Sequence, residues 1–153
     1  MCGIAGAFHP DKLSQVAFNA VRRMQRALRH RGPDGEGWFQ DRRIALAHRR
    51  LSIIDLAGGA QPLAGESPSV VAIVNGEIYN YIELQQELTA EGAQLRTRSD
   101  SEVVPFLYER HGQDFAHRLR GAFAAAIWDG SRQQLLLVRD RLGEKPLVYA
   151  TGN

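Results

Sequence analysis

The chain has 153 residues, 44% hydrophobic and 24% charged, which are the length and composition of a single soluble globular domain. The formal net charge is only +2, and basic pairs such as Arg49-Arg50 are too short to form a nucleic-acid-binding stripe. The single cysteine excludes an internal disulfide, and the longest apolar stretch, residues 122–128, is far shorter than the ~20 residues that span a bilayer. We therefore expect a cytoplasmic protein with no membrane or nucleic-acid partner.

The first third of the chain predicts a strand followed by a helix. Gly3–Phe8 is a short apolar run, typical of a buried strand, with Cys2 at its head. Ser14 is an N-cap residue for a helix that extends to about Leu28, before the Gly32-Pro33 turn stops it. The residues at helical spacing on its apolar face are Val16, Ala20, Val21, Met24, Ala27 and Leu28.

Short β-type runs come next, at residues 38–39, 44–47 and 53–54. Gly58-Gly59 marks a loop, after which Val70–Val74 is the clearest strand pattern, which we predict to end at Asn75-Gly76. A helix is predicted over residues 82–90, with Gly92 at its C-terminal end. The apolar positions of this helix are Ile82, Leu84 and Leu88.

The last third predicts a helix and a β-hairpin. Ser99-Asp100-Ser101-Glu102 matches a capping box, and Pro105 predicts that the following helix is kinked or begins late. Residues 122–128 and 134–138 have the pattern of a hairpin, and residues 147–150 are predicted as a final strand. Strands cluster at both ends of the chain without an internal repeat, which predicts an α+β fold of one domain.

Cys2 is the residue best suited to carry chemistry. Removal of Met1 would place a new α-amine on the thiol residue itself, so one residue would hold both a nucleophile and a base that titrates near neutral pH. A buried, inert cysteine at the head of a strand is the alternative interpretation. A catalytic pair of Cys2 with His30 or His48 is also open, because such partners meet in space and not in sequence.

Three further features could complete an acyl-transfer site. The Asn75 amide and the Gly76 N–H could supply two donors to a developing oxyanion, although a plain Asn-Gly turn is the alternative. Arg50 could grip a carboxylate and Asp100 could hold a substrate ammonium, although surface exposure and helix capping are the simpler interpretations. With Cys2, these are the parts needed to hydrolyse the side-chain amide of an amino acid.

The sequence contains no recognisable metal-binding or nucleotide-binding pattern. There is no Cys-x-x-Cys pair, and the five histidines show no ligand spacing, so no metal site is predicted. There is also no phosphate-binding Gly-x-x-x-x-Gly-Lys loop, and we interpret Gly143-Glu144-Lys145-Pro146 as a turn.

Blocks of sequence spread in order across nearly the whole chain resemble one family. They are MCGIAG (1–6), HRGPDG (30–35), LAHRRLSIID (46–55), VNGEIYN (74–80), SDSE (99–102) and RDRLGEKPL (139–147). Together they are similar to the N-terminal glutaminase domain of glutamine-hydrolysing asparagine synthetase, a class II glutamine amidotransferase. The match is more specific than any one motif because all the blocks occur in the same order.

The resemblance implies a fold and a set of roles. It implies a four-layer αββα N-terminal-nucleophile hydrolase fold, in which the Cys2 thiolate attacks the glutamine amide and the freed α-amine shuttles protons. Ammonia would leave first, and water would then cleave a γ-glutamyl thioester to give glutamate. By motif position, Asn75 and Gly76 would form the oxyanion hole, Arg50 would hold the α-carboxylate and Asp100 the α-amine. The residues lining the same pocket would be Leu51, Ser52, Ile53, Ile54 and Glu77.

Residues 1–153 would thus be a glutamine amidotransferase type 2 domain that is incomplete at its C-terminus. Family members usually continue through more strand and helix into an ATP-pyrophosphatase synthetase domain, whose Ser-Gly-Gly-x-Asp-Ser loop does not occur in these 153 residues. Missing strands predict an exposed sheet edge. Glutamine hydrolysis implies no cofactor, whereas ATP and magnesium are expected only for the absent synthetase domain.

The expected partners are L-glutamine and a synthetase domain or subunit that accepts the ammonia, with aspartate as the acceptor that the resemblance favours; a homodimer is left open. A non-catalytic module that binds glutamine and a generic Cys–His hydrolase are the alternative functions. A retained Met1 would cap the α-amine and favour the binding module, whereas activity that survives a blocked N-terminus would favour the generic hydrolase.

Overall fold

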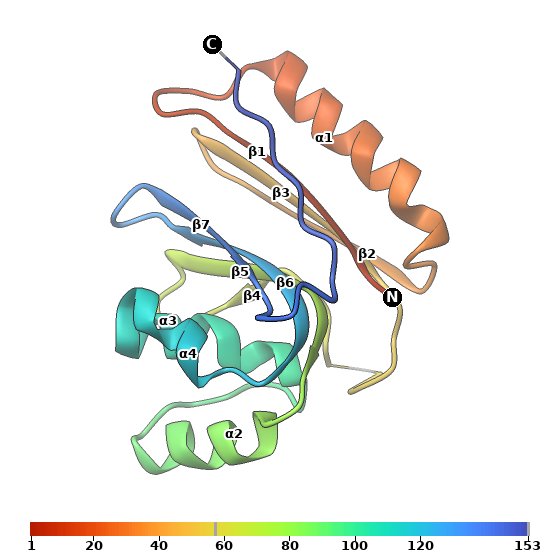
Figure 1. The fold of residues 1–153 in the computed structure, drawn as a ribbon. Coiled ribbons are helices and arrows are strands. Elements are labelled where there is room, and N and C mark those ends of the chain that lie inside the picture. The colour runs from red at the N-terminus through yellow and green to blue at the C-terminus, as the bar shows by residue number, and fades with distance from the viewer. Residues whose placement is uncertain (57, 153) are drawn as a thin grey trace.

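The computed structural model describes residues 1–56 and 58–152, which form two antiparallel sheets between layers of helix (Figure 1). The strands are β1 (Gly3–Phe8), β2 (Gly35–Gln40), β3 (Ile44–Arg50), β4 (Leu63–Ala64), β5 (Val70–Ile78), β6 (Gly121–Asp129) and β7 (Gln134–Arg139). The helices are α1 (Gln15–Ala27), α2 (Tyr81–Ala90), α3 (Val103–His111) and α4 (Phe115–Arg118). Short 3₁₀ turns lie at Leu28–His30, Asp100–Glu102 and Gly112–Asp114.

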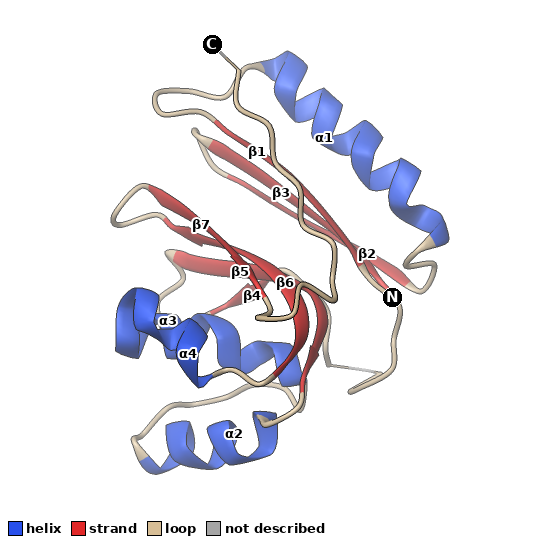
Figure 2. Cartoon of the chain, viewed as in Figure 1, coloured by secondary structure: helices blue, strands red, loops and turns tan. Residues whose placement is uncertain are grey.

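The layers follow the order helix, sheet, sheet, helix. The first sheet has the strand order β1-β3-β2 and the second β4-β5-β6-β7, and all pairings are antiparallel. Figure 2 shows α1 covering the outer face of the first sheet, and α2, α3 and α4 covering the outer face of the second. This arrangement confirms the predicted α+β class and the four-layer αββα architecture.

Each interface between layers has its own hydrophobic cluster, because strand side chains alternate between the two faces of a sheet. On β3, Ala45 and Ala47 pack toward α1, whereas Ile44 and Leu46 pack between the two sheets. Trp128 of β6 joins the cluster between the sheets, and the largest cluster lies between the second sheet and its helices. Both sheets are therefore packed on both of their faces.

Helix α1 begins as predicted but presents a different face to the sheet. The Ser14 side chain accepts a hydrogen bond from the Ala17 N–H, which confirms the N-cap. Val16 and Met24 are 74% and 48% exposed, so the predicted apolar face is wrong at these positions. Gln25 is buried instead, because its amide donates to the carbonyls of Gly37 and His48 at 2.7 and 3.3 Å. A polar residue therefore packs against the sheet where hydrophobic periodicity predicted solvent.

Three of the strand predictions need correction. Strand β5 continues to Ile78, so it does not end at Asn75-Gly76, because β6 pairs with it along its whole length. Residues 53–54 are not a strand, since this segment turns to line a pocket. Residues 147–150 are not a strand either: Val148 and Tyr149 are 92% and 78% exposed and have no pairing strand among the described residues.

The start of α3 differs from the predicted capping box. The Ser99 side chain accepts from the Ser101 N–H at 3.3 Å, but the buried Glu102 carboxylate accepts from the N–H groups of Arg96 and Thr97 and not from Ser99. Ser99 is thus an N-cap residue, but the reciprocal capping box is wrong, because the Glu102 N–H donates to the Ser99 carbonyl and not to its side chain. A 3₁₀ turn over Asp100–Glu102 precedes α3, which begins at Val103. Of the two predicted outcomes, a kink or a late start, the late start is therefore the one observed, and Pro105 lies in the first turn of the helix.

The other helix and hairpin predictions are confirmed. Helix α2 ends as expected, with Gly92 at φ +92° just beyond it, although Ile82 is 53% exposed while Leu84 and Leu88 are buried. Strands β6 and β7 form the predicted hairpin.

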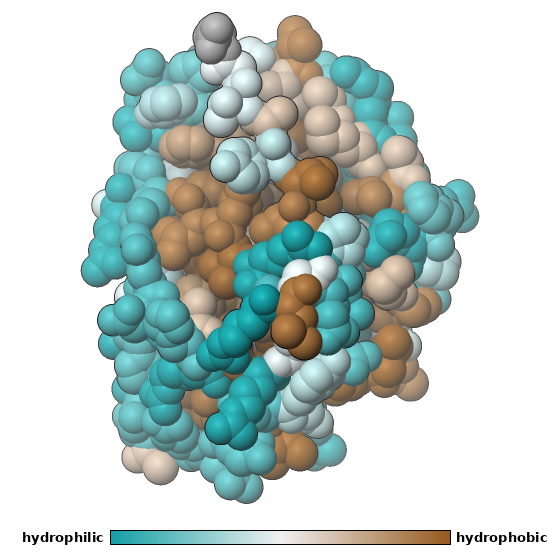
Figure 3. All heavy atoms as spheres, viewed as in Figure 1, coloured by the Kyte–Doolittle hydropathy of each residue, from teal (hydrophilic) through white to brown (hydrophobic). Residues whose placement is uncertain are grey.

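Strand β7 is an outer strand of its sheet, and hydrophobic surface lies beside it. Figure 3 shows hydrophobic side chains gathered in the region between the two sheets, next to a hydrophilic surface. Phe8 of β1 and Leu137 of β7 are 39% and 42% exposed. Among the described residues β7 is therefore an end strand with a partly exposed hydrophobic side chain, and that strands are missing beside it stays a prediction.

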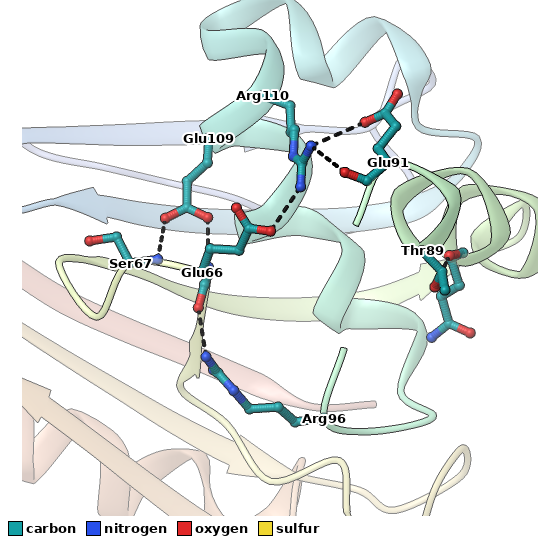
Figure 4. Close-up of polar contacts among 9 residues, drawn as sticks. Glu66, Ser67, Thr89, Glu91, Arg96, Glu109 and Arg110 are labelled. Atoms are coloured by element: carbon teal, nitrogen blue, oxygen red, sulfur yellow. Dashed lines mark hydrogen bonds and ion pairs between the residues drawn. The ribbon is translucent and has the colours of Figure 1, made fainter. Parts of the chain in front are cut away.

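A polar network holds the turn between β4 and β5 against α2 and α3 (Figure 4). The Glu109 carboxylate accepts from the backbone N–H groups of Glu66 and Ser67 at 2.7 and 2.8 Å. Arg110 forms an ion pair with Glu66 at 2.8 Å and donates to the carbonyl of Glu91 at 3.4 Å. The start of β5 is thus fixed to the helical layer before the strand reaches the pocket described next.

Candidate active site

A pocket lies at one end of the space between the two sheets, where β1 begins and β3 ends. It is lined from both sheets and from the loops that follow β3 and precede α3. The lining residues are Met1, Cys2, Arg50, Leu51, Ile53, Ile54, Gly59, Gln61, Asn75, Gly76, Glu77, Ser99, Asp100, Ser101 and Lys145. The fold therefore brings together Cys2, Arg50, Asn75, Gly76 and Asp100, which are distant in sequence.

Cys2 is held by the first residue after β3. Its Sγ accepts from the Leu51 N–H at 3.4 Å, and its carbonyl accepts from the Arg31 guanidinium at 3.1 Å. The nearest imidazoles have other partners: His30 contacts the Ala27 carbonyl and His48 the Val74 carbonyl. In the part of the chain that the structure describes, neither histidine hydrogen-bonds to Cys2, which disfavours the Cys–His pair.

The backbone of β5 offers a donor to the pocket. Along a strand, alternate N–H groups point to the same edge, so those of Val74, Gly76 and Ile78 share one edge. The Val74 N–H donates to the Gln61 side chain at 2.6 Å, and the Ile78 N–H donates to the Asp100 carboxylate at 2.8 Å. Strand β4 pairs only with residues 71–72, so the Gly76 N–H between these two contacts faces the pocket.

Gly76 is required by both backbone geometry and packing. Its φ is +143°, a region that side-chain-bearing residues rarely adopt, and a Cβ there would lie 2.0 Å from the Ala122 carbonyl oxygen. The neighbouring Asn75 side chain is buried, with its Oδ1 lacking a hydrogen-bond partner among the described residues. The Asn75 amide and the Gly76 N–H are thus adjacent donors at one wall of the pocket.

Arg50 also lines the pocket. Its guanidinium donates to the carbonyls of Ile54, Asp55 and Leu56, at 3.1, 2.5 and 3.3 Å. An arginine carries five N–H donors, so those left over remain able to meet a carboxylate in the pocket. Arg50 therefore holds the loop after β3 in place as well as contributing a positive charge.

Asp100 joins the start of the 3₁₀ turn to the end of β5. The residue is 5% exposed, and besides the Ile78 N–H its carboxylate accepts from the Ser101 hydroxyl at 3.3 Å. Burial raises the pKa of Asp100 above its ordinary value, and the nearby Glu77 carboxylate raises it further, against the hydrogen bonds that lower it. A cationic group beside Asp100 would favour its charged form, so the position suits an ammonium.

The segment after Arg50 contributes most of the residues predicted for it. Leu51, Ile53 and Ile54 line the pocket, and Glu77 lines it from the end of β5. Ser52 lies outside this lining, because its N–H donates to the Asp34 carboxylate at 2.8 Å.

Besides Met1, five further residues line the pocket without having been predicted as site residues: Gly59, Gln61, Ser99, Ser101 and Lys145. Gly59 and Gln61 fall in the predicted loop and the two serines in the predicted capping box, patterns that indicate local structure and not a site. Lys145 lies in the RDRLGEKPL block, of which residues 143–146 are predicted to form a turn. The turn is confirmed, since the Asp140 carboxylate accepts from the backbone N–H groups of Leu142, Glu144 and Lys145. That turn places Lys145 at the pocket, which its membership of a motif block could have indicated.

His48 lies behind the pocket and is uncharged. It is 1% exposed, and burial lowers its pKa from 6.5 to about 4, with the Arg50 charge lowering it further and the hydrogen bond to Val74 opposing the shift. At neutral pH the imidazole is therefore a neutral donor and cannot serve as a cationic group of the site.

The described residues, 1–56 and 58–152, contain no cluster of three or more His, Cys, Asp or Glu side chains that could hold a metal ion. Nor do they contain a helix of the length and hydrophobicity needed to cross a membrane.

Comparison with known sequences places the chain among enzymes of one kind. A family model described as "Glutamine amidotransferase domain" matches residues 1–153. Asparagine synthetase [glutamine-hydrolyzing] 1 of Bacillus subtilis (strain 168) is 44% identical over 155 residues, covering 100% of this chain and 24% of that protein. Asparagine synthetase [glutamine-hydrolyzing] of Sandersonia aurantiaca is 41% identical over 152 residues, covering 99% and 29%. The chain thus spans about a quarter of the length of these relatives.

Solved structures support the fold. The glutamine phosphoribosylpyrophosphate amidotransferase from B. subtilis aligns with a TM-score of 0.62 at 22% identity, covering 85% of this chain and 35% of that one. A structure titled as the allosteric regulatory enzyme of purine biosynthesis aligns with a TM-score of 0.68 at 22% identity, covering 92% and 37%. These likenesses show that the chain shares the fold of the matching part of both proteins.

Replacing Gly76 tests the close approach of β5 and β6. We expect Gly76→Ala to lower the free energy of unfolding by about 2–4 kcal/mol, because the methyl group would meet a backbone carbonyl that cannot move aside. Gly92→Ala is the matched control, since Gly92 also has a positive φ but open space around it. Its cost should be about 1 kcal/mol. Urea unfolding measures both, and equal losses would contradict the packing argument.

The buried His48 predicts a pH-dependent stability. Because its pKa is lower in the folded chain, the unfolded chain binds more protons between pH 6.5 and 4. Folding stability should therefore fall across this window as pH decreases, by up to roughly 3 kcal/mol from this group alone. The difference between wild type and His48→Gln, measured by urea unfolding at each pH, isolates the effect. Parallel pH profiles for the two proteins would refute it.

Proposed function

Because the chain belongs to the glutamine amidotransferase domain family, we propose that it hydrolyses the side-chain amide of L-glutamine with Cys2 as the nucleophile. This proposal rests on one observation: Cys2, the Asn75-Gly76 donors, Arg50 and Asp100 all line the same pocket. A thiol beside two oxyanion donors is suited to attack on an amide. The positive charge of Arg50 and the negative charge of Asp100 are suited to bind the α-carboxylate and α-ammonium of an amino acid.

Glutamine would bind as a zwitterion. Its α-carboxylate would meet the guanidinium of Arg50, and its α-ammonium would meet the buried carboxylate of Asp100. With both ends of the amino acid fixed, the side-chain amide would extend toward Cys2. Leu51, Ile53 and Ile54 supply apolar contacts for its methylene groups. Such positioning lowers the entropic part of the barrier.

The first half-reaction would form a thioester. The freed α-amine of Cys2 takes the thiol proton, and the sulfur bonds to the amide carbon while the carbonyl electrons move to the oxygen. The Asn75 amide and the Gly76 N–H would stabilise that oxyanion, and removing one such donor costs roughly 3 kcal/mol, or about a hundredfold in rate. The α-amine then protonates the leaving nitrogen, so the C–N bond breaks and ammonia departs.

The second half-reaction would restore the enzyme. Water attacks the same carbon while the α-amine of Cys2 accepts a proton, and the C–S bond breaks to release glutamate and the thiol. Protons and electrons balance within this cycle without a metal or a cofactor. The α-amine is available only after Met1 has been removed, and Met1 itself lines the pocket.

We further propose that the ammonia serves an ATP-dependent amidation of the asparagine-synthetase type. The similar proteins of B. subtilis and S. aurantiaca are named glutamine-hydrolyzing asparagine synthetases, and this chain corresponds to about a quarter of each. Aspartate would be the acceptor, in a synthetase domain or subunit that uses ATP and magnesium. The pocket described above would supply only the ammonia.

A non-catalytic glutamine-binding module is the second candidate. It is favoured by one observation, the presence of Arg50 and Asp100 in the pocket, because these opposite charges would bind glutamine whether or not Cys2 reacts with it. Such a module would bind glutamine without turnover.

Glutamate release tests the proposal. We expect protein whose intact mass shows loss of Met1 to release glutamate and ammonia from glutamine, and Cys2→Ala to release none. Asn75→Ala should lower kcat about a hundredfold, whereas Asn19→Ala, an amide on the exposed side of α1, should keep it.

The result that would overturn hydrolysis is a folded protein, trimmed of Met1, that binds glutamine by calorimetry and releases no glutamate. That outcome would establish the binding module. Activity that persists with Met1 retained would contradict the role given to the α-amine.

A further inference from the structure

The nucleophile and the oxyanion donors belong to different sheets. Cys2 immediately precedes β1 in the first sheet, whereas Asn75 and Gly76 lie on β5 in the second. Their spacing therefore depends on how the two sheets are held against each other. The cluster of Ile44, Leu46 and Trp128 between them supplies attraction, but hydrophobic attraction is not directional and does not set a lateral position.

His48 supplies a directional contact across this interface. It lies on β3 of the first sheet, and its Nε2 is 3.1 Å from the carbonyl oxygen of Val74 on β5. A carbonyl oxygen can only accept, so Nε2 must carry the proton and the imidazole donates. The contact is completely buried, where a hydrogen bond is stronger and its loss leaves an unpaired group. It ends on the residue immediately before Asn75.

Gln61 contacts the same residue through both ends of its side-chain amide. Its Oε1 accepts from the Val74 N–H at 2.6 Å, and its Nε2 donates to the Val74 carbonyl at 3.2 Å. The Gln61 side chain thus takes the place of a strand neighbour beyond the short β4. The Gln61 backbone is seated on β2, where a Cβ at Gly37 would lie 1.6 Å from the Gln61 carbonyl oxygen. The side chains of His48 and Gln61 therefore both connect Val74 to the first sheet.

The orientation of the Asn75 side-chain amide depends on the peptide group between Val74 and Asn75, whose carbonyl accepts from His48 and Gln61. Asn75 Oδ1 is buried without a hydrogen-bond partner among the described residues, so that amide oxygen is not held by any neighbour there. The position of its amide, and of the Gly76 N–H, is then set by the backbone that His48 and Gln61 hold.

We propose that His48, supported by Gln61, is a positioning residue that fixes the oxyanion donors of β5 relative to Cys2. The assignment rests on the proposed hydrolysis of glutamine. An oxyanion donor must lie within about 2.7–3.1 Å of the oxygen, whereas the attraction of Arg50 and Asp100 for the substrate charges varies slowly with distance. Loss of the His48 contact therefore lowers kcat and leaves KM for glutamine nearly unchanged.

The kinetic test compares His48→Phe, which keeps an aromatic ring without the donor, with His48→Gln, which restores an N–H near the position of Nε2. We expect kcat of His48→Phe to fall about tenfold or more, with KM changing less than about threefold, and His48→Gln to recover most of the loss. The rate of Cys2 alkylation by iodoacetamide should stay that of wild type in both variants, since the thiol itself is untouched. Phe115→Leu, buried in the outer helical layer, controls for a general loss of stability.

Two kinetic results would overturn the assignment. One is an unchanged kcat in folded His48→Phe. The other is a fall in kcat and in alkylation rate that Phe115→Leu reproduces, because that pattern is a purely structural effect. If His48→Phe does not fold, Gln61→Met removes the other contacts to Val74 and should give the same selective loss of kcat.

A second readout separates this proposal from the proposed function. Hydrogen exchange of the backbone amides of residues 74–78 reports how firmly β5 is held, whether or not the protein turns over glutamine. We expect exchange there to be faster in His48→Phe than in wild type and unchanged in Phe115→Leu. Equal exchange in wild type and His48→Phe would overturn the role of His48, whereas an inactive wild type with the expected exchange pattern would overturn only hydrolysis.

Discussion

The site depends on the stretch of β5 backbone that lies between two side-chain contacts. Gln61 accepts from the Val74 N–H at one end of this stretch, and Asp100 accepts from the Ile78 N–H at the other. On one edge of this strand the Val74 and Ile78 N–H groups are taken by side chains, which leaves the Gly76 N–H between them available to the pocket. On the other edge β6 approaches so closely that no side chain fits at position 76. The glycine is thus fixed by packing on one side of the strand and available for chemistry on the other.

The two sheets contribute different functional groups to the site. The first sheet presents Cys2 and Arg50 at the ends of β1 and β3, and the second presents the donors of β5. The interface between them is apolar over most of its length and becomes polar at His48, where hydrogen bonds replace non-directional packing. A rigid support for oxyanion donors is what electrostatic stabilisation of an acyl-transfer transition state requires.

Local signals in the sequence predicted local structure well, and non-local contacts account for what it missed. Ser14 as an N-cap and the β6–β7 hairpin depend on neighbouring residues, and both were predicted correctly. Asn75-Gly76 looked like a strand end because its turn chemistry is strong, yet pairing with β6 extends the strand past it. The motif blocks identified most of the pocket, but Gln61 and the contact of His48 with Val74 depend on partners at least 13 residues away, which no local pattern encodes.

The central claim is that Cys2 attacks the amide carbon of glutamine, and the thioester itself tests it most directly. Protein trimmed of Met1 can be mixed with isotopically labelled glutamine, quenched in acid during turnover, digested and examined by mass spectrometry. The account predicts a γ-glutamyl group on the peptide that begins with Cys2, appearing before steady state and absent after the glutamine is consumed. Turnover without any adduct, or with the label on another residue, would contradict it.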